Sequence, residues 1–261
     1  MVNSTPTLSG QVYLYKDIEL LNSEVHSRLG LSSDPHRFAF AAKETVLPLL
    51  ATEFGKAALH YPIVFAGEAK RPVVVMGTVA GQNLFISVDG SFAEDAYVPA
   101  HLRRYPFALA DEADGDRSLV CIDRAAAFLN ETQENALFVD GTPSAVLQNA
   151  IEFLNAFEAD ARRTDAFIAL LIEHDLFEVK HTIFTPQHVE GQPTAPRMVA
   201  DYYAISETKF AELSMEAVKK LHDTGALACI HAHFLSLYNW ERLIERSLKA
   251  ATADSAALAA E

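Results

Sequence analysis

The sequence predicts an α+β fold in which a strand-rich first half packs against a mainly helical second half. Half of the 261 residues are apolar, which is enough to bury a sizeable core. Between residues 61 and 122, short apolar and β-branched runs separated by turn residues predict hairpins. After residue 142, apolar residues recur mostly at steps of three and four, which indicates amphipathic helices.

The first half is expected to contain short strands and one inserted helix. The strands are predicted at residues 11–14, 63–65, 72–77, 83–88 and 118–122. The turn-like stretch 78–82 would join 72–77 and 83–88 in a hairpin. The helix is predicted from Pro48, which suits a first helical turn, to about His60, and Tyr61-Pro62 would end it.

The middle of the chain is expected to hold two helices and then two strands. Thr142 followed by Pro143 has the pattern of a helix cap and first turn, and predicts a helix to about Ala161. Thr164 is expected to cap the next helix. Strands are predicted at 177–184 and 198–205.

The C-terminal region shows the strongest helical periodicity. Ser214 is expected to cap a helix that ends near Asp223, and Gly225 suits the left-handed residue that follows it. The final helix is predicted from about 227 to 248. We expect a single domain over residues 1–247, with a subdivision near 124–142 as an alternative, and an alanine-rich tail at 248–261.

Charge and composition exclude several classes of protein. The net charge is −14, and basic residues cluster only in short doublets such as 103–104, 162–163 and 219–220, so no nucleic-acid partner is expected. The sequence has no signal-peptide pattern and no run of about 18 apolar residues, which predicts a soluble cytoplasmic protein without a membrane span. Cys121 and Cys229 lie in apolar surroundings and are expected to be free thiols.

The pair His231-Ala-His233 has a spacing that on a strand would suit a metal site. On the predicted helix, however, residues two apart are separated by about 200° and point to nearly opposite sides. Helical metal pairs use steps of three or four, and the residues three and four positions after each histidine, Phe234 and Leu235 for His231 and Ser236 and Leu237 for His233, are poor ligands. We therefore expect structural histidines and no bound metal.

No motif in the sequence indicates a catalytic nucleophile, a nucleotide or another cofactor. The G-x-S-x-G, P-loop and dinucleotide-binding patterns are absent. The acidic loop at 111–116 does not match the calcium-loop frame and is expected to be solvated.

The segment 97–107 is the best candidate for a ligand site. Pro99 could start one helical turn and Pro106 would end it. Two adjacent arginines in so acidic a chain could gather an anion or a carboxylate, so Tyr97, Arg103, Arg104 and Tyr105 are the predicted ligand-binding residues. The alternative is that the arginines pair with Asp95 or Asp111 and brace the fold.

Several stretches together resemble the SapC family of bacterial proteins, from about residue 11 to residue 247. They are PL at 48–49, EF at 53–54, YPIVF at 61–65, NLF at 83–85, DG at 89–90, YVP at 97–99, RRYPF at 103–107, CID at 121–123, LF at 137–138, DG at 140–141, GAL at 225–227 and AHFLSL at 232–237. The stretch RRYPF and the pattern A-H-x-x-S-L, which includes His233 but not His231, are the most specific of these.

The resemblance implies a non-catalytic accessory or binding protein, associated with a surface layer or with nutrient uptake. Its protein partners would then be surface-layer components or parts of TonB-dependent uptake systems. Two alternatives stay open. One is an enzyme that acts on a peptide or a carbohydrate near Arg103, Arg104 and Tyr105, and the other is a structural protein of the surface layer.

Overall fold

The computed structural model describes residues 13–111, 118–132, 134–184 and 197–258, and it confirms the α+β class. The strands are β1 Ile18–Leu20, β2 Gly30–Leu31, β3 Val46–Pro48, β4 Ile63–Ala66, β5 Arg71–Val75, β6 Phe107–Asp111, β7 Ser118–Asp123, β8 Leu129–Asn130, β9 Phe138–Val139, β10 Thr142–Pro143, β11 Phe177–Phe184 and β12 Arg197–Ile205. The helices are α1 Phe54–Ala57, α2 Ala100–Arg103, α3 Ala145–Glu173, α4 Glu207–Ala211, α5 Met215–Asp223, α6 Ala226–Ser236 and α7 Asn239–Leu258, with short 3-10 turns at Ala39–Ala41 and Ala51–Glu53.

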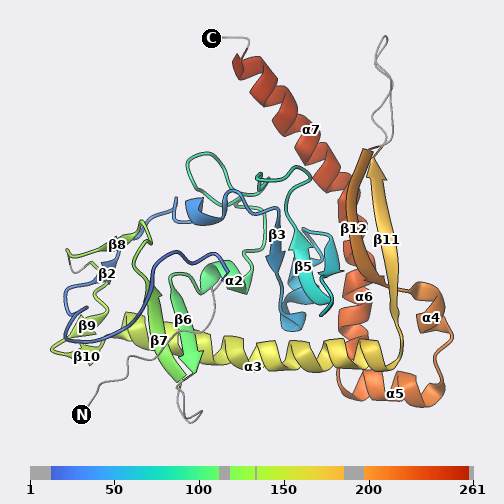
Figure 1. Cartoon of the computed structure of the whole chain (residues 1–261), viewed down its shortest axis with the longest axis horizontal. Coiled ribbons are helices and arrows are strands. Elements are labelled where there is room, and N and C mark those ends of the chain that lie inside the picture. The colour runs from blue at the N-terminus through green and yellow to red at the C-terminus, as the bar shows by residue number, and fades with distance from the viewer. Residues whose placement is uncertain (1–12, 112–117, 133, 185–196, 259–261) are drawn as a thin grey trace.

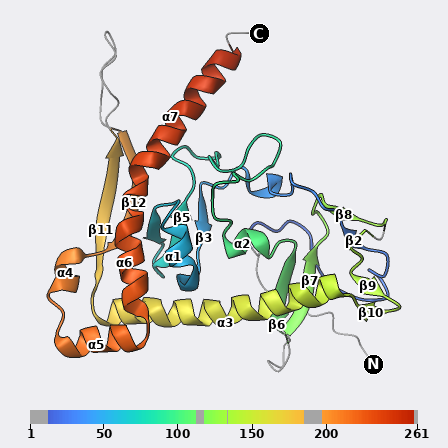
Figure 2. The same ribbon diagram turned by 180° about the vertical axis from the view of Figure 1, so that it is seen from behind.

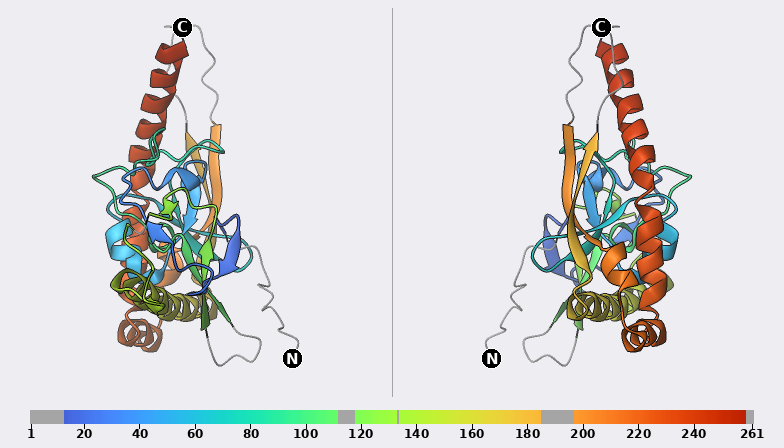
Figure 3. Two further views of the ribbon diagram at one scale, coloured as in Figure 1. Left: turned by 90° about the vertical axis from the view of Figure 1, so that its left-hand side faces the viewer. Right: turned by 90° about the vertical axis from the view of Figure 1, so that its right-hand side faces the viewer.

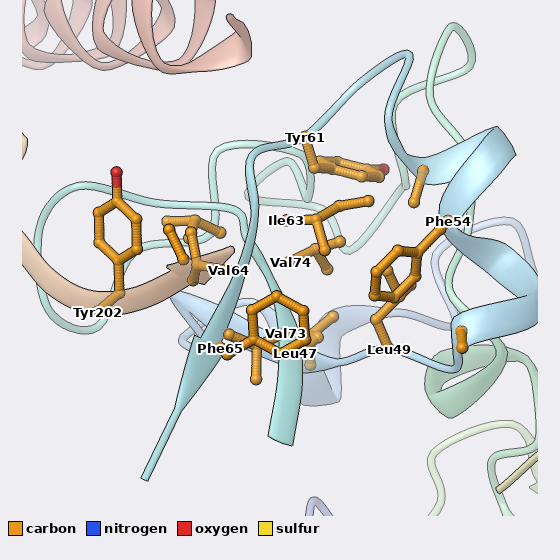
Figure 4. Close-up of a cluster of buried hydrophobic side chains, with 14 of the residues drawn as sticks. Leu47, Leu49, Phe54, Tyr61, Ile63, Val64, Phe65, Val73, Val74 and Tyr202 are labelled. Atoms are coloured by element: carbon orange, nitrogen blue, oxygen red, sulfur yellow. The ribbon is translucent and has the colours of Figure 1, made fainter. Parts of the chain in front are cut away.

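The main sheet has five antiparallel strands in the order β11-β12-β4-β5-β3. β11 and β12 are paired along their length (Figure 1), whereas β12 and β4 pair only at Tyr203 and Phe65. Side chains alternate between the faces of a strand, so Ile63 and Phe65 point to one side and Val64 to the other. Figure 4 shows Val64 and Tyr202 on the opposite side of β4 from Ile63 and Phe54.

A smaller sheet, ordered β1-β7-β6, lies beside the main one, and α3 runs along both (Figures 1 and 2). The first part of α3 contributes Leu147 and Leu154 to a core with Ile122 of the smaller sheet. The last part contributes Phe167 and Leu171 to the core of the main sheet. One long helix therefore connects the two cores.

The C-terminal helices cover one face of the main sheet and then leave it. α6 contacts both β4 and β12, and α5 packs against α6. α7 starts at the end of α6 and extends away from the rest of the chain (Figures 1 and 3). Its N-terminal turn is fixed by Asn239, whose side-chain amide donates hydrogen bonds to the carbonyl oxygens of Ala58 (2.7 Å) and Tyr61 (3.2 Å).

Most of the predicted elements are confirmed, with small shifts at their ends. β4, β5, β7, β11 and β12 correspond to the strands predicted at 63–65, 72–77, 118–122, 177–184 and 198–205. Ser214 caps α5 through a hydrogen bond to the amide of Ala217, and Gly225 adopts a left-handed φ of 77°. The final helix is interrupted once, because the chain turns between α6 and α7 at 237–238.

The prediction that Thr164 starts a new helix is wrong, since α3 continues through it. Its hydroxyl donates to the carbonyl oxygen of Asp160 one turn back, at 2.8 Å, and accepts a hydrogen bond from the amide of Ala51 at 2.9 Å. The cap of α3 is Ser144, which accepts from the amide of Leu147. The residues predicted as cap and first turn form β10 instead.

Three predictions for the first half are also wrong. Residues 83–88 do not form a strand, because Asn83 folds its side chain onto the amide of Phe85 and leaves only a bridge between Ile86 and Phe92. Pro48 ends β3, paired with Val73, and helical structure begins only at residue 51. In the predicted strand 11–14, residues 13–14 form a turn and residues 11–12 lie outside the described part, as do 112–116 of the acidic loop.

Candidate functional site

The predicted segment 97–107 forms one helical turn followed by a strand. Pro99 precedes α2, and β6 begins at Phe107, directly after the cis peptide bond between Tyr105 and Pro106. The prediction that Pro99 and Pro106 bound a single turn is therefore confirmed. The four predicted side chains fall into two groups with different neighbours: Tyr97 with Arg103, and Arg104 with Tyr105.

Tyr97 and Arg103 meet at Glu53, a carboxylate that is only 5% exposed. Oε1 of Glu53 accepts hydrogen bonds from the hydroxyl of Tyr97 (2.8 Å) and the amide of Ala100 (2.7 Å), and Oε2 accepts from the amide of Leu50 (3.1 Å). Nη2 of Arg103 lies 3.6 Å from Oε1 and donates to the hydroxyl of Tyr97 at 3.0 Å. Burial and the Glu53 charge raise the pKa of Tyr97 to about 12. Glu53 thus has partners for its lone pairs and anchors the turn.

Arg104 and Tyr105 belong to a different environment from that of Arg103. The guanidinium of Arg104 lies over the rings of Phe157 (4.5 Å) and Tyr15 (5.7 Å). The ring of Tyr105 is 8% exposed and stacks on Phe40 with 3.8 Å between ring centroids. Burial and the nearby charge of Asp123 raise the pKa of Tyr105. The structure therefore brings Tyr97 and Arg103 together but separates them from Arg104 and Tyr105.

The carboxylate that faces Arg103 is Glu53 and not Asp95, whose carboxylate faces Arg246 at 3.7 Å. The side chain of Asp111 lies outside what the structure describes. Glu53 was missed from the sequence because it stands in an apolar stretch, LLATEF. A charged residue between apolar neighbours is the signal that could have identified it, since a buried charge requires a partner.

The two histidines of the H-A-H pair have different surroundings on α6. His233 is fully buried and is hydrogen-bonded on both ring nitrogens to backbone atoms of β4 and β12. His231 is exposed and has the ring of Phe210 beside it, edge to face. Among the described residues, no group of three or more His, Cys, Asp or Glu side chains is arranged to hold a metal ion.

A cavity of about 330 Å³ lies between α7 and the loop before α2, and we call it the α7 cavity. One wall carries Arg242, Arg246 and Lys249, which share a face of α7 because they are four and three residues apart. The opposite wall includes His60, Phe85 and Asp95. Tyr97 follows Asp95 and Ala96 of this wall in the chain, and its carbonyl oxygen accepts a hydrogen bond from the hydroxyl of Tyr61 at 2.5 Å.

The charges of the α7 cavity suit an anion. Its three cations outnumber the carboxylates of Asp95 and Glu245, in a chain whose net charge is −14. The guanidinium of Arg246 is held over the ring of Phe85 at 4.3 Å, and its Nη1 is buried with no hydrogen-bond partner among the described residues. Burial and the charge of Arg242 lower the pKa of His60, so its ring adds no fixed positive charge at neutral pH.

Comparisons with known proteins give one match. The model of the SapC family matches residues 21–243, which include the Tyr97–Phe107 segment and all of α6. No curated protein and no solved structure matches the chain. In the described part, no helix combines the length and the apolar character needed to cross a bilayer.

Proposed function

Because the chain belongs to the SapC family, we propose that it is a non-catalytic accessory protein that binds an anionic small molecule in the α7 cavity. The observation that carries the proposal is the guanidinium of Arg246, which is held over the ring of Phe85 and lines the cavity together with the cations of Arg242 and Lys249. A carboxylate or phosphate oxygen is the group that such a donor favours.

The predicted site residues take a supporting role in this proposal. Glu53 fixes Tyr97 and Arg103, and the backbone of Tyr97 is in turn held by Tyr61 next to the cavity wall. Tyr97 and Arg103 would thus position the loop that carries Asp95. Arg104 would link α3 to the N-terminal segment through the rings of Phe157 and Tyr15, and Tyr105 would hold the turn before β6 against Phe40.

A direct binding measurement tests the proposal. We expect citrate or inorganic phosphate to give saturable heat in isothermal titration calorimetry, and this heat to decrease as the salt concentration rises. Arg246→Gln should weaken binding at least tenfold, which is about 1.4 kcal/mol. Arg162→Gln is the matched control, because Arg162 is exposed on α3 and lies outside the cavity. Equal affinities for the two variants, or no saturable heat, would refute the proposal.

The accessory role has its own test. By family resemblance, the partners would be surface-layer components or parts of a TonB-dependent uptake system. A pull-down from the native host that recovers no partner, together with turnover of a substrate by the purified chain, would contradict it. The cytoplasmic location expected from the sequence stays a prediction that cell fractionation can check.

The alternative of an enzyme acting on a peptide or carbohydrate also stays a prediction. The three residues of its expected site, Arg103, Arg104 and Tyr105, do not share one environment. Tyr105 is buried against Phe40, whereas Arg103 is exposed and paired with Glu53. Activity toward peptides or glycosides that is lost in Arg103→Ala, with the fold intact, would favour it over the accessory role.

A further inference from the structure

The main sheet ends in two edge strands that differ in length. β3, at one edge, has three residues and ends at Pro48, which has no backbone N–H group to donate to a further strand. β11, at the other edge, has eight residues and contains no proline (Figure 1). In the described part of the chain, β12 is the only strand that pairs with β11. A long edge of this kind is a template for pairing with another strand.

The register between β11 and β12 shows which backbone groups of β11 point outward. The carbonyl oxygen of Leu176 accepts a hydrogen bond from the amide of Ser206 at 2.8 Å, one residue before β11 begins. In an antiparallel ladder, the N–H and C=O groups of one residue point to the partner strand, and those of the next residue point away from it. Residues 178 and 180 therefore turn toward β12, and residues 177, 179 and 181 turn outward.

The middle of this outward edge is free to pair. The carbonyl oxygen of Phe177 accepts a hydrogen bond from Nζ of Lys209 at 2.9 Å. Among the described residues, no group bonds to the outward N–H and C=O groups of Val179 and His181. The side chain of Val179 is also 59% exposed. The edge thus offers both backbone hydrogen-bonding groups and an apolar side chain to another strand.

The charges of β11 fit a second copy of the same strand. Glu178 and Lys180 point to the same face of β11, where their charged groups lie 3.1 Å apart. If two copies of β11 run antiparallel about a twofold axis at Val179, Glu178 of each copy lies opposite the partner's Lys180.

The neighbouring registers fit less well. An axis at residue 178 or 180 would set two like charges directly opposite each other, which destabilises a strand pair. An axis at residue 181 would carry the pairing across the register shift between Thr182 and Ile183. The axis at Val179 avoids both problems.

We propose that the chain forms a homodimer in which β11 pairs with β11 of a second copy, antiparallel and centred on Val179. In this dimer Val179 exchanges two backbone hydrogen bonds with the partner's Val179, and Phe177 pairs with the partner's His181. The carbonyl oxygen of Phe177 has a second lone pair for the incoming amide. The two main sheets then form one continuous sheet.

Sedimentation velocity and hydrogen exchange of the full chain test the dimer. Two paired strands bury less area than a standard interface, so we expect a Kd on the order of 10–100 µM. Above this concentration the amides of Val179 and His181 should exchange more slowly than below it, whereas the amide of Glu178, which already turns toward β12, should not change. A chain that stays monomeric, or a dimer without protection at Val179, would overturn the proposal.

A charge exchange tests the register. Lys180→Glu sets carboxylates opposite each other at both ends of the pairing and should weaken the dimer at least tenfold, which is about 1.4 kcal/mol. Adding Glu178→Lys restores opposite charges and should return Kd to within about threefold of its original value. Lys43→Glu is the matched control, because Lys43 is exposed near the opposite edge of the sheet. Equal effects of Lys180→Glu and Lys43→Glu, or no recovery in the double variant, would refute this register.

A substitution at the axis tests the edge itself. Val179→Lys brings two ammonium groups together at the axis and should abolish the dimer, while the pairing of β11 with β12 stays intact. Val139→Lys on β9 is the control, since Val139 has a similar exposure of 55%. Circular dichroism should show both variants folded. A folded Val179→Lys variant that dimerises as well as Val139→Lys would contradict the proposal.

Discussion

The imidazole of His233 donates a hydrogen bond from Nδ1 to the carbonyl oxygen of Ile63, 2.9 Å away and 170 residues earlier in the chain. Its Nε2 accepts a hydrogen bond from the amide of Ile205 at 3.1 Å, which fixes the tautomer because an amide can only donate. β4 and β12 pair only at Tyr203 and Phe65, so the ring bridges the two strands where their own pairing has ended. Ser236 completes the arrangement by accepting from the amide of Ile63 at 3.0 Å.

Replacing His233 should therefore destabilise the fold strongly. His233→Leu replaces the imidazole with an apolar side chain. The buried carbonyl group of Ile63 and the buried amide of Ile205 then lose their hydrogen-bond partner. We expect a loss of about 2–5 kcal/mol in the free energy of unfolding, measured by urea denaturation. His231→Leu, on the exposed side of the same helix, should change it by less than about 0.5 kcal/mol. Similar losses for the two variants would contradict the assigned role.

The stability of the protein should decrease below pH 6.5. Burial lowers the pKa of His233 from 6.5 to about 4, and burial together with the charge of Arg104 lowers that of His101 to about 3. The unfolded chain then binds more protons than the folded one below pH 6.5, so acid favours unfolding. Each histidine should contribute a loss of about 1 kcal/mol per pH unit between 6.5 and its folded pKa.

Urea denaturation at pH 7.5, 6.0 and 5.0 measures this dependence. In His233→Asn the slope between pH 6.0 and 5.0 should be smaller by about 1 kcal/mol per pH unit, and the part that remains comes from the lowered pKa values of His101 and His60. A slope that stays the same in this variant would show that the acid sensitivity comes from other groups.

Glu53 and Arg103 should contribute unequally to stability, although they form one ion pair. Glu53→Ala removes the acceptor of the Tyr97 hydroxyl and of the Leu50 and Ala100 amides, and should cost about 3–5 kcal/mol. Arg103→Ala should cost less than about 1 kcal/mol, because Arg103 is 40% exposed. Thermal unfolding followed by circular dichroism checks both, with the exposed Glu68→Ala as control. A larger loss for Arg103→Ala would contradict this asymmetry.

Thr164 offers a test of the contact between α3 and the turn before α1. Thr164→Val keeps the shape of the side chain and leaves the amide of Ala51 without an acceptor, so we expect a loss of about 1–3 kcal/mol. Thr164→Ser keeps the hydroxyl and removes one methyl group, which should cost about 1 kcal/mol or less. If chemical denaturation gives the same value for both, the hydrogen bond to Ala51 does not contribute.

The single-turn helix at α2 could be predicted because Pro99 and Pro106 act through the backbone of the residues next to them. The contacts that its side chains make could not be predicted. Whether Arg103 faces an anion or the body of the protein depends on Glu53, which is fifty residues away and comes close only when the main sheet forms. The α7 cavity escaped prediction for the same reason, since its cations and its opposite wall come from distant segments.

The sequence by itself determined the features that arise within one or two turns of chain. These are the α+β class, the main strands, the cap at Ser214, the left-handed Gly225 and the helical setting that separates His231 from His233. Only the tertiary structure decided that Thr164 lies inside one continuous helix, that residues 83–88 are not a strand, and that His233 joins β4 to β12. In each of these cases a side chain forms a hydrogen bond that settles the local conformation. For Thr164, for His233 and for Asn83, whose side-chain amide also donates to the carbonyl oxygen of Ala41, a partner lies more than twenty residues away, and no local pattern specifies that distance.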